Sequence, residues 1–253
     1  MITFTEAQLV AWLSPLFWPF VRVLALFSAL PVLGQRTVPA RVRVALAFLI
    51  VVAAQASLPP MPQVALDSAA AFALVAQNVV IGLTLGFAVR VVFAAVEFAG
   101  ELIGLQMGLN FAGFFDPATG GQATATSRFF GTMIGFLFIA MNAHLLVTAA
   151  VVQSFHAFPV GPEPFAFLRA LAPQAWGSEI FALGLWIALP LVGMLLFTNL
   201  VLGIISRVAA QMNIFAIGFP ITLGVGLVGV LITLPMMNAP FTMALERMLM
   251  RFQ

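Results

Sequence analysis

Ile180–Ser206 has the sequence IFALGLWIALPLVGMLLFTNLVLGIIS, which contains no charged side chain. About 20 apolar residues in a helix cross the ~30 Å hydrocarbon core of a bilayer, so this stretch is long enough to span a membrane. Backbone groups in lipid must be satisfied internally, and a long continuous apolar run satisfies them as a helix rather than as a barrel strand. The stretch therefore predicts a transmembrane helix.

Further apolar runs predict more helices of the same kind, namely Leu9–Leu33, Val44–Leu58, Ser68–Val89, Phe129–Phe158 and Val208–Leu245. Leu102–Phe115 is shorter and predicts half a span. In the last long run, three prolines predict a kinked helix or a helix with flanking turns: Pro220, Pro235 and Pro240. We therefore predict an all-α integral membrane protein with about six to seven hydrophobic helical segments.

The composition excludes several classes of protein. Of the 253 residues, 63% are hydrophobic and only 7% are charged, whereas soluble domains carry roughly a quarter of charged residues. So few charges cannot cover the surface of a water-soluble enzyme, and a disordered chain would be far more polar. The chain has ten basic residues, all arginine, and eight carboxylates. This surplus of positive charge is too small for a nucleic-acid-binding patch.

Two carboxylates inside an apolar region are the first candidates for chemistry. Arg90, Glu97 and Glu101 follow one another at i, i+7 and i+11, which places them on one face of a helix. Glycines at four-residue spacing lie on or beside that face: Gly100, Gly104 and Gly108. The carboxylates could relay protons or ions, or they could make a polar, close-packed contact with another helix or subunit. We favour packing, because transporters usually place acidic groups on more than one span.

No pattern in the sequence indicates catalysis, a metal site or a cofactor. His144 and His156 are the only histidines, there is no cysteine, and a metal site needs three or four ligands. No G-x-S-x-G elbow is present, and a phosphate-binding loop of the G-x-x-x-x-G-K-[ST] type is impossible without lysine. We therefore expect a protein that is not an enzyme.

Arg207–Pro220, with the sequence RVAAQMNIFAIGFP, gathers polar groups beside an apolar run. Arg207, Gln211 and Asn213 would each seek partners on other helices. Packing alone does not explain why three such groups cluster there.

Three long phrases resemble the FliR family, the flagellar subunit of the type III secretion export gate. They are LPVLGQRTVPARVRVALA at 30–47, GELIGLQMGLNFAGFFDPATG at 100–120 and RVAAQMNIFAIGFPITLGVGL at 207–227. Injectisome relatives of the family share the layout, but FAIGFP is more typical of the flagellar form. Ala210 departs from the family, which commonly has proline there.

The resemblance implies a non-enzymatic subunit of a helical export-gate complex that forms and gates the conduit for unfolded export substrates. Its partners would be FliP-like and FliQ-like subunits, with FlhB and FlhA beside them, in the bacterial inner membrane at the flagellar basal body. Residues 1–253 would form a single membrane domain, of which 1–175 is FliP-like and 176–253 is a FliQ-like helical hairpin. The alternative function is a secondary transporter or channel for a small solute, but the sequence lacks the symmetric broken helices and ion ligands of a transporter.

The resemblance also implies a plug loop at residues 106–128, whose methionine and aromatic side chains would seal a pore by apolar packing. The expected plug residues are Gln106, Met107, Gly108, Leu109, Asn110, Phe111, Phe114, Phe115, Asp116, Pro117, Gly120 and Gly121. A core-facing helix end is the alternative for the aromatic part of this segment. Residues expected to pack against other subunits are Arg90, Glu97, Gly100, Glu101, Gly104, Arg207, Gln211, Asn213, Phe215, Gly218 and Pro220.

Overall fold

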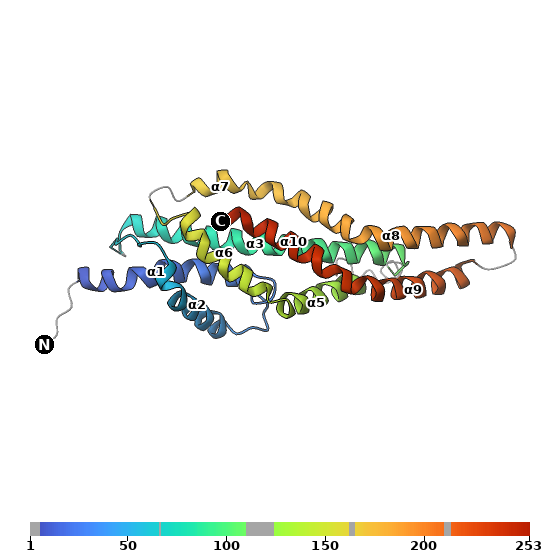
Figure 1. Ribbon diagram of the computed structural model, residues 1–253, viewed down its shortest axis with the longest axis horizontal. Coiled ribbons are helices and arrows are strands. Elements are labelled where there is room, and N and C mark those ends of the chain that lie inside the picture. The colour runs from blue at the N-terminus through green and yellow to red at the C-terminus, as the bar shows by residue number, and fades with distance from the viewer. Residues whose placement is uncertain (1–5, 66, 110–123, 162–164, 210–213) are drawn as a thin grey trace. The chain divides into compact units, whose positions relative to one another are not determined.

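A computed structural model describes residues 6–65, 67–109, 124–161, 165–209 and 214–253, and within these ranges it contains helices and no strand (Figure 1). The all-α prediction is thus confirmed. The long helices are α1 (Glu6–Ala29), α2 (Ala40–Ala54), α3 (Ala69–Gln106), α5 (Ala125–Ala140), α6 (Ala143–Ala157), α8 (Gly177–Val208), α9 (Ile214–Thr233) and α10 (Asn238–Leu249). The shorter elements are α7 (Ala166–Leu171) and the 3-10 turns η1 (Gln55–Ser57), η3 (Pro173–Trp176), η4 (Leu234–Met237) and η5 (Met250–Phe252).

In the described residues, five helical stretches are long and apolar enough to cross a membrane, or six if the bent pair α5 and α6 counts as one span. The expected single run Phe129–Phe158 is that pair, bent by 72°. Asn142 stands at the break with a positive φ of 55°, a left-handed conformation that asparagine tolerates better than most residues.

The predicted half-span Leu102–Phe115 contains no separate helix in its described part, residues 102–109, and its remainder lies outside the described residues. Its first residues continue α3, which runs without a break over 38 residues. Arg90, Glu97 and Glu101 therefore lie inside one long helix instead of ending it, because arginine and glutamate are good helix formers. The last predicted run does break as expected, at η4, which contains Pro235.

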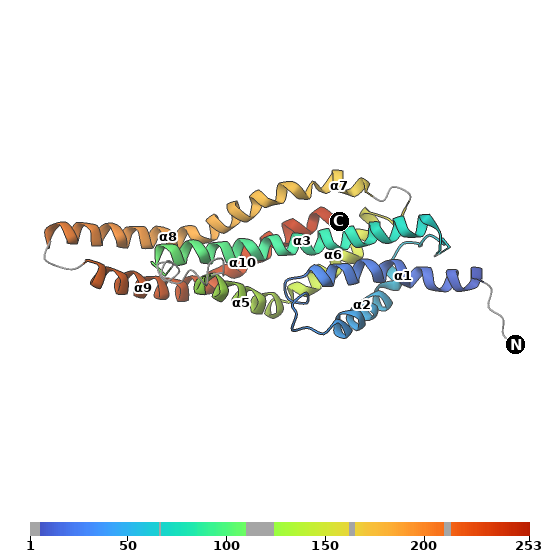
Figure 2. The same ribbon diagram turned by 180° about the vertical axis from the view of Figure 1, so that it is seen from behind.

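The described residues form two compact units. Unit 1 comprises Met1–Val91, Ile139–Trp176 and Leu245–Gln253. In it, α2 lies beside α1, as both views show (Figures 1 and 2). Two glycines of α3 allow α1 to approach closely: a Cβ at Gly82 would collide with the Arg22 carbonyl oxygen, and one at Gly86 would lie 2.5 Å from Ala29 Cβ.

Unit 2 comprises Val92–Phe138 and Gly177–Ala244, and here α9 packs along α8 (Figure 2). Gly229 of α9 meets Leu191 of α8, since a Cβ at this glycine would lie 2.7 Å from Leu191 Cδ1. The buried residues given for α8 form one stripe with helical spacing: Gly184, Ala188, Leu191 and Leu195. Large apolar side chains elsewhere on α8 are exposed, including Leu185, Leu189, Leu196, Phe197 and Leu200.

Candidate functional site

The C-terminus of α3 is closed by a turn that depends on Gly108. Its φ is +79°, in the left-handed region where glycine has no steric penalty. The Gly108 N–H donates to the Leu105 carbonyl oxygen at 3.1 Å, and the Leu109 N–H donates to the Gly104 carbonyl oxygen at 3.0 Å. These two bonds form a Schellman motif, which satisfies the last carbonyl groups of the helix.

The N-terminus of α5 is capped from two directions. Thr124 Oγ1 accepts a hydrogen bond from the Ser127 N–H at 3.2 Å, as a helix N-cap does. The Thr124 N–H in turn donates to Glu101 Oε1 at 3.2 Å. In an ordinary capping box a glutamate of the same helix accepts this N–H. Here a carboxylate of α3 takes that place, where the α5 dipole also favours negative charge.

Close packing of α3 on α5 explains two of the glycines singled out in the sequence, Gly100 and Gly104, and a third glycine on the opposing helix. A Cβ at Gly100 would lie 2.9 Å from Phe130 Cδ2, and one at Gly104 would collide with Thr126 Oγ1. On the opposing helix, a Cβ at Gly131 would lie 2.9 Å from Glu97 Oε1. No described atom lies within 4 Å of a Cβ at Gly135, so that glycine does not mark a close approach in this chain.

Met107 also belongs to this arrangement. Its side chain is fully buried and lies over Gly226 of α9, where an added Cβ would lie 2.5 Å from Met107 Cγ and 2.7 Å from Sδ. Gln106, Gly108 and Leu109 are half-buried. We use the term loop base for Gly104–Leu109 together with Thr124–Ser127, since these residues lie at the two ends of segment 110–123, part of the plug loop expected from the sequence.

The other predicted residues fall into three groups. Arg90, Glu97, Arg207 and Pro220 are exposed, whereas Gly218 is buried. The remaining plug residues lie outside the described residues: Asn110, Phe111, Phe114, Phe115, Asp116, Pro117, Gly120 and Gly121. Gln211 and Asn213 lie outside them too, as does the side chain of Phe215.

Arg22 of α1 is a buried polar site that the sequence analysis missed. Its side chain has no exposed surface. Nε donates to Asn78 Oδ1 at 2.9 Å, Nη1 donates to the Ser154 carbonyl oxygen at 2.8 Å, and Nη2 donates to the Phe158 carbonyl oxygen at 2.9 Å. The guanidinium also lies 3.8 Å from the centre of the Phe155 ring, a favourable cation–π distance.

Each acceptor that Arg22 contacts among the described residues is neutral, and two of them are carbonyl oxygens at the C-terminal end of α6. A helix C-terminus carries partial negative charge and unsatisfied carbonyl groups. The arginine thus caps α6 and compensates its own burial without a carboxylate. In the sequence, the available signal for this site was that Arg22 is the one charged residue within the apolar run Leu9–Leu33.

Gln77 of α3, the neighbour of Asn78, fixes the turn after α6. Gln77 Nε2 donates to the Pro159 carbonyl oxygen at 3.2 Å, and the Gly161 N–H donates to Gln77 Oε1 at 3.3 Å. Asn78, which accepts from Arg22, donates to the Leu74 carbonyl oxygen at 2.8 Å. We call Arg22, Gln77, Asn78 and Ser154 the Arg22 cluster; it joins α1, α3 and α6 within unit 1.

The sequence of this chain is similar to that of known proteins, and the similarity indicates the function of these features. Residues 13–248 match the family described as bacterial export proteins, family 1. The flagellar biosynthetic protein FliR of Escherichia coli (strain K12) is 44% identical over 241 residues, covering 95% of this chain and 92% of the relative. The chain belongs to the FliR family of bacterial export proteins. The FliR of Pectobacterium carotovorum is 42% identical over 93% of the chain and 90% of its own length, and that of Bacillus subtilis is 32% identical over 83% and 82%.

Membership of the FliR family confirms the function that the sequence predicted, a subunit of the flagellar protein export gate. The family and the apolar helices together make the chain a membrane-embedded component of the flagellar export apparatus. The alternative of a small-solute transporter is not supported.

Proposed function

We propose that this chain is a non-enzymatic wall subunit of the export conduit, assembled with FliP-like and FliQ-like subunits and next to FlhB and FlhA. Membership of the FliR family carries the proposal. It is supported by α8, where buried residues form one stripe while large apolar side chains such as Leu189 and Phe197 are exposed. Such a helix needs lipid or other subunits to cover it. The proposed location is the bacterial inner membrane, at the flagellar basal body.

Residues 106–128 are proposed to plug this conduit when no substrate is present. The loop base supports this role, since the Schellman turn at Gly108 and the cap at Thr124 hold both ends of the loop. Met107 is buried against Gly226, so we assign it to anchoring. Sealing is assigned to Phe111, Phe114 and Phe115, because aromatic side chains block ions without strong directional bonds and a polypeptide can displace them.

The division of the chain into a FliP-like part at 1–175 and a FliQ-like hairpin at 176–253 remains part of the proposal. Within unit 2, α8 and α9 form an antiparallel pair, which is the kind of element that such a hairpin requires. Of the predicted subunit contacts, exposed Arg90 and Arg207 are available to partners. Gly100, Gly104 and Glu101 already make contacts within the chain.

Secretion by a strain that lacks this chain tests the function. Flagellar proteins should disappear from the culture medium, and plasmid-borne chain should restore them, while uptake of small solutes is unchanged. A strain that still exports flagellar proteins at the parental level would contradict the proposal. Co-expression tests the partners: the chain should purify with FliP-like and FliQ-like subunits as one large particle, and a stable, fully helical monomer from the chain expressed alone would argue against them.

A further inference from the structure

Helix α2 presents most of its surface to its surroundings. Two of its residues are buried, Ala47 and Val51, and their spacing of four places them on one narrow stripe, in a helix that packs on α1. Large apolar side chains around the remaining circumference are exposed, among them Val42, Val44, Leu46, Phe48, Leu49 and Val52. An apolar surface of this kind on a helix of a membrane protein faces lipid acyl chains unless another protein covers it.

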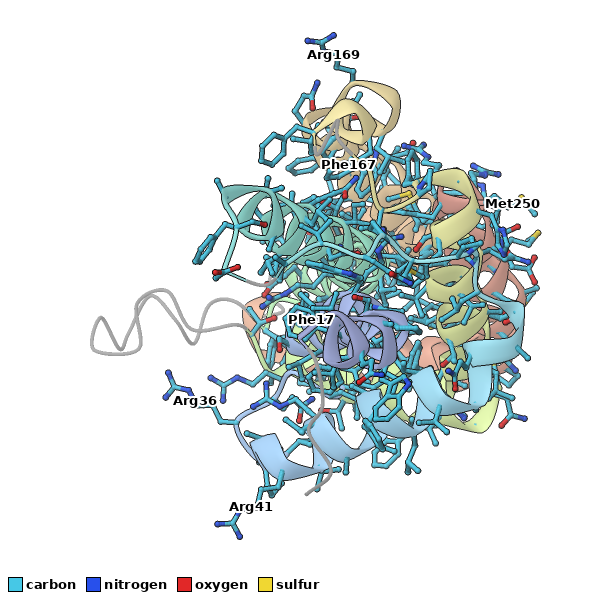
Figure 3. All side chains as sticks on the ribbon, turned by 90° about the vertical axis from the view of Figure 1, so that its left-hand side faces the viewer. Phe17, Arg36, Arg41, Phe167, Arg169 and Met250 are labelled. Carbon is cyan, nitrogen blue, oxygen red and sulfur yellow. The ribbon has the colours of Figure 1, made fainter. Side chains whose placement is uncertain are left out.

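Three arginines stand at the N-terminal end of this apolar surface. Arg36 and Arg41 are exposed and Arg43 is half-buried. Figure 3 shows the side chains of Arg36 and Arg41 extending away from the ribbon in the lower part of the view, whereas Arg169 extends from the top. No acidic residue occurs between positions 7 and 66 of the sequence, so this segment supplies no counter-charge of its own.

Within α2 itself, no acidic side chain offsets the charge at this end of the helix. The first turn contains no acidic residue, and Pro39 at the N-cap makes no side-chain hydrogen bond to the helix. Cations at a helix N-terminus are unfavourable because the dipole is positive there. Within the described part of the chain, no acceptor pairs with the buried Nε of Arg43. A bound anion would stabilise the exposed guanidinium groups of Arg36 and Arg41 at the positive end of the helix dipole.

The opposite end of the α2 segment, in η1, contacts α6. The Ser57 carbonyl oxygen in η1 lies 3.0 Å from His156 Nε2. From this end to the arginines, the 15 residues of α2 measure about 22 Å, which is less than the ~30 Å hydrocarbon core. A helix of this length, lying among acyl chains, brings its arginines to the level of one layer of headgroups.

We propose that α2, with Arg36, Arg41 and Arg43, is a docking surface for anionic phospholipid. The apolar side chains contact acyl chains, and the guanidinium groups bind the phosphate of the headgroup. Guanidinium is suited to this, since its planar N–H groups donate two parallel hydrogen bonds to phosphate oxygens. Anionic lipid is favoured over zwitterionic lipid because it supplies net negative charge where the protein has an unbalanced positive charge. This proposal requires membrane embedding and is independent of the conduit and the plug.

Competition between two lipids tests the proposal on the full-length chain, in the complex in which detergent extracts it. The probes are phosphatidylglycerol and phosphatidylcholine with identical palmitoyl and oleoyl chains, added in equal amounts, and intact-mass spectrometry counts the lipids that remain bound. The parent should retain phosphatidylglycerol preferentially. Arg36→Gln/Arg41→Gln should reduce this preference on the order of fivefold for each arginine removed.

The matched control is Arg169→Gln/Arg247→Gln, which also removes two exposed arginines of unit 1 and the same net charge. It should keep the parental preference. The proposal is overturned if Arg36→Gln/Arg41→Gln retains the preference, or if both double variants lose it equally, since the effect would then be one of total charge. Loss of a protein subunit with the lipid preference unchanged would assign the arginines to a protein partner and would also overturn it.

Discussion

Glu101 of α3 accepts a hydrogen bond at 3.2 Å from the backbone N–H of Thr124, which is the N-cap of α5. This bond places a carboxylate at the N-terminus of α5 and fixes the point at which the loop ends. It gives Glu101 a structural task, which supports the packing interpretation over a proton relay.

The contribution of the Glu101–Thr124 hydrogen bond to stability should be measurable by thermal unfolding. Glu101→Ala removes the acceptor and should cost about 1 kcal/mol, the usual cost of losing an N-cap interaction. Glu101→Gln keeps an oxygen acceptor at the same position and should cost less. The midpoint of thermal unfolding of the purified complex compares the two, and equal midpoints for Ala, Gln and parent would show that the bond does not stabilise the loop base.

Export should survive loss of both negative charges. Glu97→Gln/Glu101→Gln preserves shape and hydrogen-bonding capacity, and packing requires nothing more. Secreted flagellar protein should therefore remain near the parental amount. If the variant complex assembles normally but no longer exports, the carboxylates act in proton transfer and the packing interpretation is wrong.

The glycines of the α3–α5 contact can be tested against a glycine outside it. Gly104→Ala would force its Cβ against Thr126 Oγ1 and should destabilise the complex by roughly 1–3 kcal/mol, as overpacking does. Gly135→Ala meets no described atom within 4 Å and should be neutral or gain up to about 1 kcal/mol from helix propensity. Thermal unfolding of both variants measures the difference, and a similar effect at the two positions would contradict the close packing.

Arg22 should tolerate no replacement that lacks a planar guanidinium group. Arg22→Met removes the guanidinium donor from Asn78 Oδ1 and from the carbonyl oxygens of Ser154 and Phe158. Each buried acceptor left unsatisfied costs about 1–3 kcal/mol, so much less folded protein should accumulate in membranes. Arg169→Met, at an exposed position, is the control. Equal amounts of the two variants would mean that the Arg22 cluster is not a stabilising element.

The sequence predicted the helices well where a run was apolar and uninterrupted, as in Ile180–Ser206, which lies inside α8. It failed at Glu97 and Glu101, because charge was taken as the end of a span. In the structure, these side chains are supported by α5, through Thr124 for Glu101 and beside Gly131 for Glu97. Such support comes from residues distant in sequence, and no local pattern reveals it.

The candidate site, like the helices, could be predicted from the sequence only in part. The glycine spacing at Gly100 and Gly104 correctly indicated close packing, but the sequence did not show that the partner helix is α5 of the same chain. The Schellman turn was present in the sequence as Gly108 after a helical run, yet Gly108 was interpreted only as part of the glycine series and of the plug. The role of Arg22 could not be predicted, because its acceptors are distant in sequence and two of them are backbone carbonyl groups more than 130 positions away.

The central claim is that the loop held by this base closes the conduit, and ion conductance tests it most directly. Residues 110–123 are replaced by a short Gly/Ser bridge, which preserves the turn at Gly108 and the cap at Thr124, and the purified complex is reconstituted in planar bilayers. The variant should assemble like the parent yet conduct ions in the absence of export substrate, while the parent stays closed. A variant that assembles normally and is as impermeable as the parent would contradict the claim.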